Sequence, residues 1–274
     1  MKKKFCIIVP AYRKLTVTER AALVQIAKTL KDKTNVFLMR PERLDISEHM
    51  SIFPEMQDLC LDDKWFESTA TYSQLLVRDW FYKMFSQYEY MVILQLDVWL
   101  VKDDISEWCD RGYDYIGAPI QVNTAGWHNF RVDAEGNTIV TPKIGNGGFS
   151  LRKIDTFIEL TDLDGYIAKR YNITEETISR IIYEDLWFCD VLAEYYDLER
   201  PGFMEAFKFA MDMNPDITEN NFEVKELPTG IHAFDKNIPF WKERIPELAA
   251  KDIYDCSYEA HKNFIDTYYY RDKK

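Results

Sequence analysis

The sequence has few of the residues that build covalent cross-links or metal clusters. Only five cysteines occur among 274 residues, and they are widely spaced, with no Cys-x-x-Cys pair. This pattern is typical of buried thiols in a reducing compartment and argues against a disulfide framework or a cysteine-based zinc site. Only four histidines are present.

Basic charge is also in deficit. The chain has 34 lysines and arginines against 46 aspartates and glutamates, a formal net charge of −12. Such a balance excludes a protein that binds nucleic acid mainly by electrostatic attraction. An anionic membrane surface would repel the body of the protein for the same reason.

Long apolar runs are missing as well. None reaches the ~18 residues that a membrane span requires. The N-terminal stretch MKKKFCIIVPAY ends its apolar segment at Pro10, which is too short for a signal peptide, and no small-residue cleavage site follows. We therefore expect no transmembrane segment and a cytoplasmic location.

What the sequence does contain is an alternation of strands and helices. Continuous apolar runs at 5–12 and 35–41 are typical of strands buried on both faces, and a shorter strand is expected within 58–66. Apolar residues three or four apart predict amphipathic helices over 16–30 and 73–88. This alternation predicts an α/β fold with a mostly parallel central sheet.

The segment LQLDVWLV places one charged residue inside the strongest strand pattern of the chain, at 90–101. A carboxylate within an apolar run is costly unless it has a partner. Ligands bind at the carboxyl ends of strands in parallel α/β sheets, so Asp97 is a candidate binding residue. The other interpretation is an aspartate that forms a turn or caps a helix.

Three motifs in the second half each have an ordinary structural interpretation too. GNGGFSLR, at 145–152, predicts a glycine turn, which also lets backbone amides approach a ligand. YEDLWF puts two acids in a long helix or broken pair of helices over 174–196, where acids can simply complement the helix dipole. A further helix is predicted over 199–213. GIHAF carries His232, and a lone histidine is usually structural.

Together, on an α/β frame, these features fit the transfer of a sugar from a nucleotide. The diphosphate leaving group needs its charge neutralised, commonly by Mg²⁺ or Mn²⁺ on carboxylate oxygens, and an imidazole can join the ligands of Mn²⁺. The acceptor hydroxyl needs a carboxylate base within hydrogen-bond reach. The motifs offer a residue for each task.

The sequence resembles the GT-A glycosyltransferases, in particular a bacterial branch with a strand-end Q-x-D, then YDYIGAP, GNGG-SLR and ED-[WF]F. The matching segments here are LQLDVW, YDYIGAP, GNGGFSLR and EDLWF, and the resemblance runs from about Phe5 to about Phe234. It implies a GT-A-like fold in one domain over 1–274. Residues 1–120 would form the nucleotide-binding half, and 121–274 an irregular acceptor and catalytic half.

The resemblance also implies roles for individual residues. Asp97 corresponds to the first acid of the DxD motif, which contacts the metal and the donor diphosphate, and His232 to the histidine that completes the metal site. Asp185 matches the base of inverting members, and Glu184 would shape the pocket or supply a hydrogen bond beside it. Donor contacts are implied for Pro10, Ala11, Tyr12, Tyr72, Arg78, Asn146, Gly147 and Gly148.

One position departs from the family pattern, because Trp99 stands where DxD has its second acid. A bound Mn²⁺ or Mg²⁺ would lose one carboxylate ligand. Asp103 or Asp104 would have to substitute, although both are expected to cap the helix that follows. A metal-independent enzyme would instead need cations on the diphosphate, for which Arg78 and Arg152 are the candidates.

We therefore expect a hexosyltransferase that moves a sugar from a nucleotide-sugar donor to a glycan or lipid-linked acceptor in surface polysaccharide synthesis. One alternative is a catalytically inactive carbohydrate-binding or scaffold relative. Another α/β nucleotide enzyme is disfavoured, because the chain has no GxGxxG, no GxxxxGK[ST] and no strand-end DxD phosphatase pair. The tail YYYRDKK, at 268–274, is expected either to pack as a helix or to dock a lipid-linked acceptor or a membrane surface.

Overall fold

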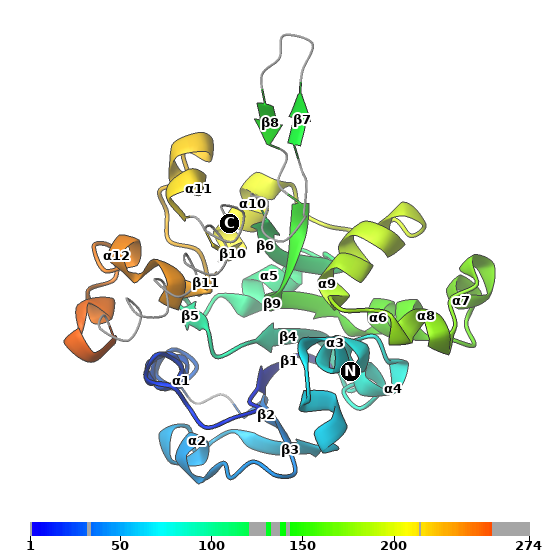
Figure 1. The fold of residues 1–274 in the computed structure, drawn as a ribbon, viewed down its shortest axis with the longest axis horizontal. Helices are drawn as coiled ribbons and strands as arrows, with labels where there is room; N and C mark the ends of the chain where they lie inside the picture. Colours follow the sequence, from blue (N-terminus) through cyan, green and yellow to red (C-terminus); the bar gives the residue numbers. More distant parts are fainter. Residues whose placement is uncertain are drawn as a thin grey trace, which may run out of the picture.

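The computed structural model describes residues 2–31, 34–120, 130–132, 138–140, 143–213 and 215–253. Its centre is a six-stranded sheet in the order β3-β2-β1-β4-β9-β6 (Figure 1). Neighbouring strands are parallel from β3 to β4, whereas β9 is antiparallel to both β4 and β6. The predicted α/β fold with a mostly parallel sheet flanked by helices is confirmed. The strands are β1 (Lys3–Pro10), β2 (Val36–Pro41), β3 (Gln57–Leu61), β4 (Tyr88–Leu94), β6 (Tyr115–Ile120) and β9 (Lys143–Lys153).

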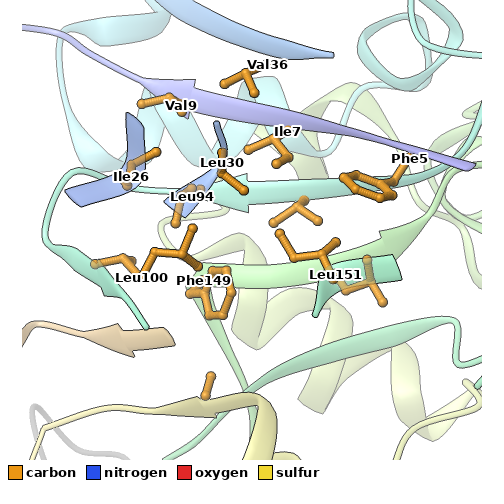
Figure 2. Close-up of a cluster of buried hydrophobic side chains, with 14 of the residues drawn as sticks. Phe5, Ile7, Val9, Ile26, Leu30, Val36, Leu94, Leu100, Phe149 and Leu151 are labelled. Atoms are coloured by element: carbon orange, nitrogen blue, oxygen red, sulfur yellow. The ribbon is translucent and has the colours of Figure 1, made fainter. Parts of the chain in front are cut away.

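Alternate residues of β1 pack on opposite faces of the sheet, as a strand buried on both sides requires. Ile7 and Val9 share one buried cluster with Ile26 of α1 (Val17–Thr29), as Figure 2 shows. Thr16 begins that helix with a capping box, in which its side chain accepts from the backbone of Glu19. Cys6 and Ile8 belong to the cluster on the other face.

The other face is covered by α3 (Thr69–Leu76), α4 (Asp79–Lys83) and α6 (Ile154–Thr161). The single helix predicted over 73–88 is wrong, because the chain breaks into α3 and α4 at Val77 and Arg78. Arg78 has an extended backbone, and its side chain reaches Glu175, far away in the sequence. Hydrophobic periodicity does not encode such a tertiary contact.

A second, three-stranded sheet adjoins the first in the order β10-β11-β5. The strand predicted over 90–101 is therefore two strands in different sheets, since the chain turns after β4 and resumes as β5 (Val98–Leu100). The helix predicted over 199–213 is also wrong at its end: α10 (Phe203–Phe209) gives way to β10 (Ala210–Met211). β10 pairs with β11 (Gly230–His232), and the sheet packs its own apolar cluster around Trp99, Ile231 and Phe234.

The pattern over 174–196 is resolved as a broken set of helices: α8 (Glu175–Ser179), α9 (Glu184–Leu186) and a π-helical turn, Trp187–Val191. Within 121–143, β7 (Phe130–Val132) and β8 (Thr138–Val140) pair antiparallel and project from the body (Figure 1). The tail at 268–274 lies outside the described residues. The remaining helices are α2 (Ser47–Ile52), α5 (Ile105–Asp110), α7 (Tyr166–Tyr171), α11 (Pro215–Phe222) and α12 (Ile238–Trp241).

None of the helices in the described part of the chain has both the length and the apolar character needed to cross a bilayer.

Candidate functional site

A cleft of about 910 Å³ opens at the carboxyl ends of β1 and β4. The end of β1 contributes Pro10, Ala11 and Tyr12, helix α3 contributes Tyr72, and the turn after β4 contributes Asp97. These five residues were each predicted to face the donor, and the structure brings them to one cavity. Its position is the ligand-binding edge of a parallel α/β sheet.

Asp97 and His232 face each other beside this cleft. The pairing of β11 with β5 sets His232 opposite Val98, so that its Nε2 lies 3.4 Å from Oδ1 of Asp97. This Oδ1 is buried and accepts no hydrogen bond from any residue that the structure describes. Burial raises the pKa of Asp97, but the facing imidazole and the charge of Lys236 together lower it, and the net pKa is lowered. Burial likewise lowers the pKa of His232, yet Asp97 and Asp212 hold it well above its usual value.

Behind the histidine lies Asp212, which sequence reasoning missed. Its Oδ1 is 2.8 Å from Nδ1 of His232, and its Oδ2 accepts from the side-chain amide of Asn146 at 3.1 Å. Asp212 follows β10 directly, and β10 pairs with β11, so register alone places it near the histidine. The available signal was an acid in the apolar run FAMDM, the same anomaly that drew attention to Asp97.

Gly147 and Gly148 lie inside strand β9, so the predicted glycine turn is wrong. Neither glycine has a left-handed backbone. Glycine is required at both positions because close packing leaves no room for a side chain. A Cβ at Gly148 would stand 2.2 Å from Nε2 of His232, and one at Gly147 would stand 2.5 Å from Oε1 of Glu184. The pair thus separates the His232 side of the site from the Glu184 side.

Asp185 occupies that second side. Its Oδ2 accepts from the backbone N–H of Gly147 at 2.9 Å, and its Oδ1 accepts from Leu186 at 2.8 Å. Burial, helped by the charge of Glu184, raises the pKa of Asp185 to about 7 despite these two hydrogen bonds. A carboxylate with such a pKa accepts a proton readily near neutral pH.

Glu184, its neighbour, is held in a buried ion pair. Oε1 accepts from Nη2 of Arg152 at 2.9 Å, and Oε2 accepts from the hydroxyl of Ser73 at 3.1 Å. Arg152 is fully buried and also donates to Ser150 and to the hydroxyl of Tyr82. Its donors are thereby directed inward, away from the cleft.

The cations at the cleft differ from those that the sequence suggested. Arg78 is not part of the cleft lining, and its Nη1 is 2.6 Å from each carboxylate oxygen of Glu175. Arg13 and Lys236 do line the cleft, and neither was predicted. Arg13 follows the end of β1 and pairs with Glu19 at 2.9 Å. Lys236 follows His232 by four residues, and its charge lowers the pKa of Asp97 further.

Trp99, in place of the second DxD acid, is buried and packs on Phe234, with ring centroids 5.4 Å apart. Asp104 stands at the N-cap position of α5 as predicted, but its side chain makes no capping bond and instead accepts from Thr229 at 2.6 Å. It is therefore engaged elsewhere. No group of three or more His, Cys, Asp or Glu in the described ranges is arranged to hold a metal ion.

Asp97 and His232 nevertheless fit as two ligands of one ion. Two ligand atoms on adjacent positions of an octahedral Mn²⁺ or Mg²⁺ ion, each ~2.1 Å from it, lie about 3.0 Å apart. Oδ1 and Nε2, 3.4 Å apart, are close to that spacing. The carboxylate of Asp212 on the far ring nitrogen also matches the usual chemistry of a metal-binding histidine. Any further ligands would have to come from a bound diphosphate or from water.

Comparison with known proteins gives a family match. A family model with the description "Protein of unknown function (DUF5672)" matches residues 55–232, a segment that includes Asp97, the glycine pair, Asp185 and, at its end, His232. No curated protein matches the chain.

Solved structures with a similar fold include glycosyltransferases. The bifunctional glycosyltransferase WbbM is 12% identical with a TM-score of 0.50 over 93% of this chain and 52% of its own, so this chain spans about half its length. Mouse xyloside xylosyltransferase 1 is 13% identical over 84% and 97% of the two chains, with a TM-score of 0.49. Core-mannan synthase A from Aspergillus fumigatus, in its Mn/GDP form, is 12% identical over 74% and 73%, with a TM-score of 0.44. At 12% identity, the likeness to WbbM shows a shared fold and nothing more.

Proposed function

The chain belongs to the DUF5672 family of proteins of unknown function, and from the geometry of its site we propose that it is a glycosyltransferase. The observation that carries the proposal is the facing pair of Asp97 and His232 beside the 910 Å³ cleft, with Asp185 on the other side of Gly147 and Gly148. A nucleotide-sugar would lie in the cleft, with its diphosphate toward Asp97. Its sugar would lie toward the glycine pair.

The donor half of the site matches the chemistry of a diphosphate. Arg13 and Lys236 bring two cationic side chains to a cleft that is also lined by Glu19, Glu67, Asp97 and Asp235, so a diphosphate there needs a further positive charge. Asp97 and His232 would hold a divalent cation, Mn²⁺ or Mg²⁺, which when bound supplies charge neutralisation for the leaving diphosphate. Tyr12, half-exposed at the end of β1, offers a ring for the nucleoside.

Asp185 would accept the proton of the acceptor hydroxyl. A pKa of about 7 suits a general base near neutral pH. Glu184 has a different part in this proposal, because Arg152 and Ser73 occupy both its oxygens. It positions α9 and raises the pKa of Asp185 by its charge, and it takes no proton itself.

A second cavity, of about 510 Å³, would receive the acceptor. It is lined by Tyr183, Leu186 and Trp187, which flank Asp185 in the chain, together with Thr174 and Thr177 of the capping box of α8. Aromatic rings beside polar side chains suit a glycan or the sugar end of a lipid-linked acceptor, as in surface polysaccharide synthesis in the cytoplasm. Trp187→Ala should raise the KM for the acceptor and leave donor affinity unchanged, and an unchanged KM would remove the acceptor from this cavity.

Thermal melting with a panel of nucleoside diphosphates and Mn²⁺ tests the donor site. Ligand binding stabilises the folded state by RT ln(1 + [L]/Kd), about 2.7 kcal/mol at a hundredfold excess over Kd. We expect one base to raise the melting temperature of the wild type and to have no effect on Asp97→Asn. The proposal fails if no base raises it, or if Asp97→Asn responds as the wild type does.

A further inference from the structure

Burying the carboxylate of Asp212 at its position costs folding free energy. Only 5% of its surface is exposed, and it follows a short strand at the edge of an apolar cluster. A buried carboxylate destabilises the fold unless it is fully hydrogen-bonded. Asp212 meets that condition with two partners, and both belong to the site: Nδ1 of His232 at 2.8 Å and the amide of Asn146 at 3.1 Å.

The second partner ties Asp212 to the glycine pair. Asn146 donates its amide to Asp212 and accepts, with its Oδ1, the backbone N–H of Gly148 at 2.8 Å. Gly148 in turn lies directly against His232, because even a Cβ there would strike the ring. Hence the imidazole is confined on one side by Gly148 and on the other by Asp212. Neither residue lines the cleft itself.

We propose that Asp212 is a positioning residue that aims Nε2 of His232 at the ion-binding space beside Asp97. The inference rests on the proposed function, in that the cleft is taken as a diphosphate and cation site. By accepting a hydrogen bond from Nδ1–H, Asp212 keeps that proton on Nδ1, so an ion that displaces the proton from Nε2 meets the lone pair on the atom that faces Asp97. The outer carboxylate also makes that lone pair more basic.

This arrangement explains how the site tolerates Trp99. The residue opposite Trp99 in the ladder is Ile231, so the large ring packs beneath the strand that carries His232. Trp99 supplies no carboxylate ligand to the ion. The second carboxylate of the site is Asp212, which acts on the ion through His232. Asp212 thereby strengthens a ligand that the chain already has.

A titration of the full chain with Mn²⁺ in the absence of nucleotide tests the proposal. The EPR signal of free Mn²⁺ measures how much of the ion is bound. Loss of an outer-shell partner typically weakens metal affinity about 10–100-fold. We expect that loss for Asp212→Ala and a smaller one for Asp212→Asn, whose single oxygen still accepts from Nδ1. Asp114→Ala is the matched control, because Asp114 is 7% exposed and hydrogen-bonded to Thr156 at the far end of β9. It should melt earlier than the wild type and bind Mn²⁺ unchanged.

Three results would overturn the inference. They are a wild type that binds no Mn²⁺, an Asp212→Ala that binds Mn²⁺ as the wild type does, and an Asp114→Ala that loses as much affinity as Asp212→Ala. Should Asp212→Ala fail to fold, the Asp212→Asn variant decides by the same comparison. Failure of the proposed function is separate. If the chain binds Mn²⁺ and Asp212→Ala weakens that binding, but no sugar is transferred, the proposed glycosyltransferase activity is wrong. The positioning role of Asp212 then still holds.

Discussion

At the scale of single residues, Asp97 and Asp185 have different surroundings and should fail differently when changed. Asp97 lines the cleft and faces His232, so Asp97→Asn should weaken donor binding and slow turnover together. Asp185 does not line the cleft, and its carboxylate accepts from the backbone N–H groups of Gly147 and Leu186, so Asp185→Asn should keep donor affinity. Loss of a general base lowers the rate about 10²–10⁴-fold.

Donor affinity by calorimetry and turnover by product release, measured on both variants, check this division. If Asp185→Asn turns over within about threefold of the wild type, well short of the loss expected for a general base, Asp185 is not the base. A retaining transfer, which needs no enzyme base of this kind, would then be the mechanism to test.

The pKa of Asp185 makes a prediction about pH. Because only the ionised carboxylate accepts a proton, kcat/KM of the wild type should rise as the pH is raised through about 7, the pKa of Asp185. A profile already flat from pH 5 to pH 8 would contradict it.

The same raised pKa predicts how stability varies with pH. Between the usual aspartate pKa and about 7, the folded state binds more protons at Asp185 than the unfolded state does, so raising the pH destabilises the wild type. Asp185→Asn has no ionisable group at this position, so it does not lose this stability as the pH is raised. Its melting temperature relative to the wild type should therefore increase from pH 5 to pH 8, and a difference independent of pH would refute the raised pKa.

At the scale of elements, strand β9 shapes the site because its glycines pack closely against side chains from other segments. Gly148→Ala would put a Cβ 2.2 Å from Nε2 of His232 and 2.8 Å from Oε1 of Gln95, so either the ring or the strand has to move. A displacement of ~1 Å in a catalytic site can cost ~10²-fold in rate. We expect a loss of that order in turnover, together with weaker Mn²⁺ binding.

Gly202→Ala is the control, because a Cβ at Gly202 meets nothing within 4 Å. It should leave melting temperature, Mn²⁺ binding and turnover unchanged. Equal losses for the two alanine variants would show that the close approach at Gly148 is not what matters.

Elements also show where sequence reasoning stopped. Apolar runs predicted β1, β2 and β4, because burial on both faces leaves a local pattern. Apolar spacing also placed α1, but it chose the wrong face: Val24 is exposed, whereas Leu23 and Ile26 are buried. Sequence patterns failed to predict element boundaries that are set by contacts between residues far apart in the chain. Three features depend on partners far along the chain: the break between α3 and α4, the strand β10, and the continuation of β9 through two glycines, where its pairing with β6 shifts register.

At the scale of the whole molecule, the central sheet and the small sheet meet at Asp97. β4 belongs to the first and β5 to the second, and the turn between them holds the aspartate. Resemblance and strand order were enough to predict that Asp97, His232 and the β1 end lie near one edge. Asp212, Arg13 and Lys236 were missed, because two- and three-residue strands and loop cations leave no periodic signal. The catalytic and binding roles of these residues stay predictions.

Release of nucleoside diphosphate from a panel of nucleotide-sugars, with Mn²⁺ and the full chain, tests the central claim most directly. Transfer to an added glycan, or slowly to water, liberates the same product, so the assay works whichever acceptor the enzyme uses. We predict release from one class of donor by the wild type, little by Asp185→Asn and none by Asp97→Asn. If no donor yields product above the Asp97→Asn background, the chain is a binding or scaffold protein on a glycosyltransferase fold, and the proposed function is wrong.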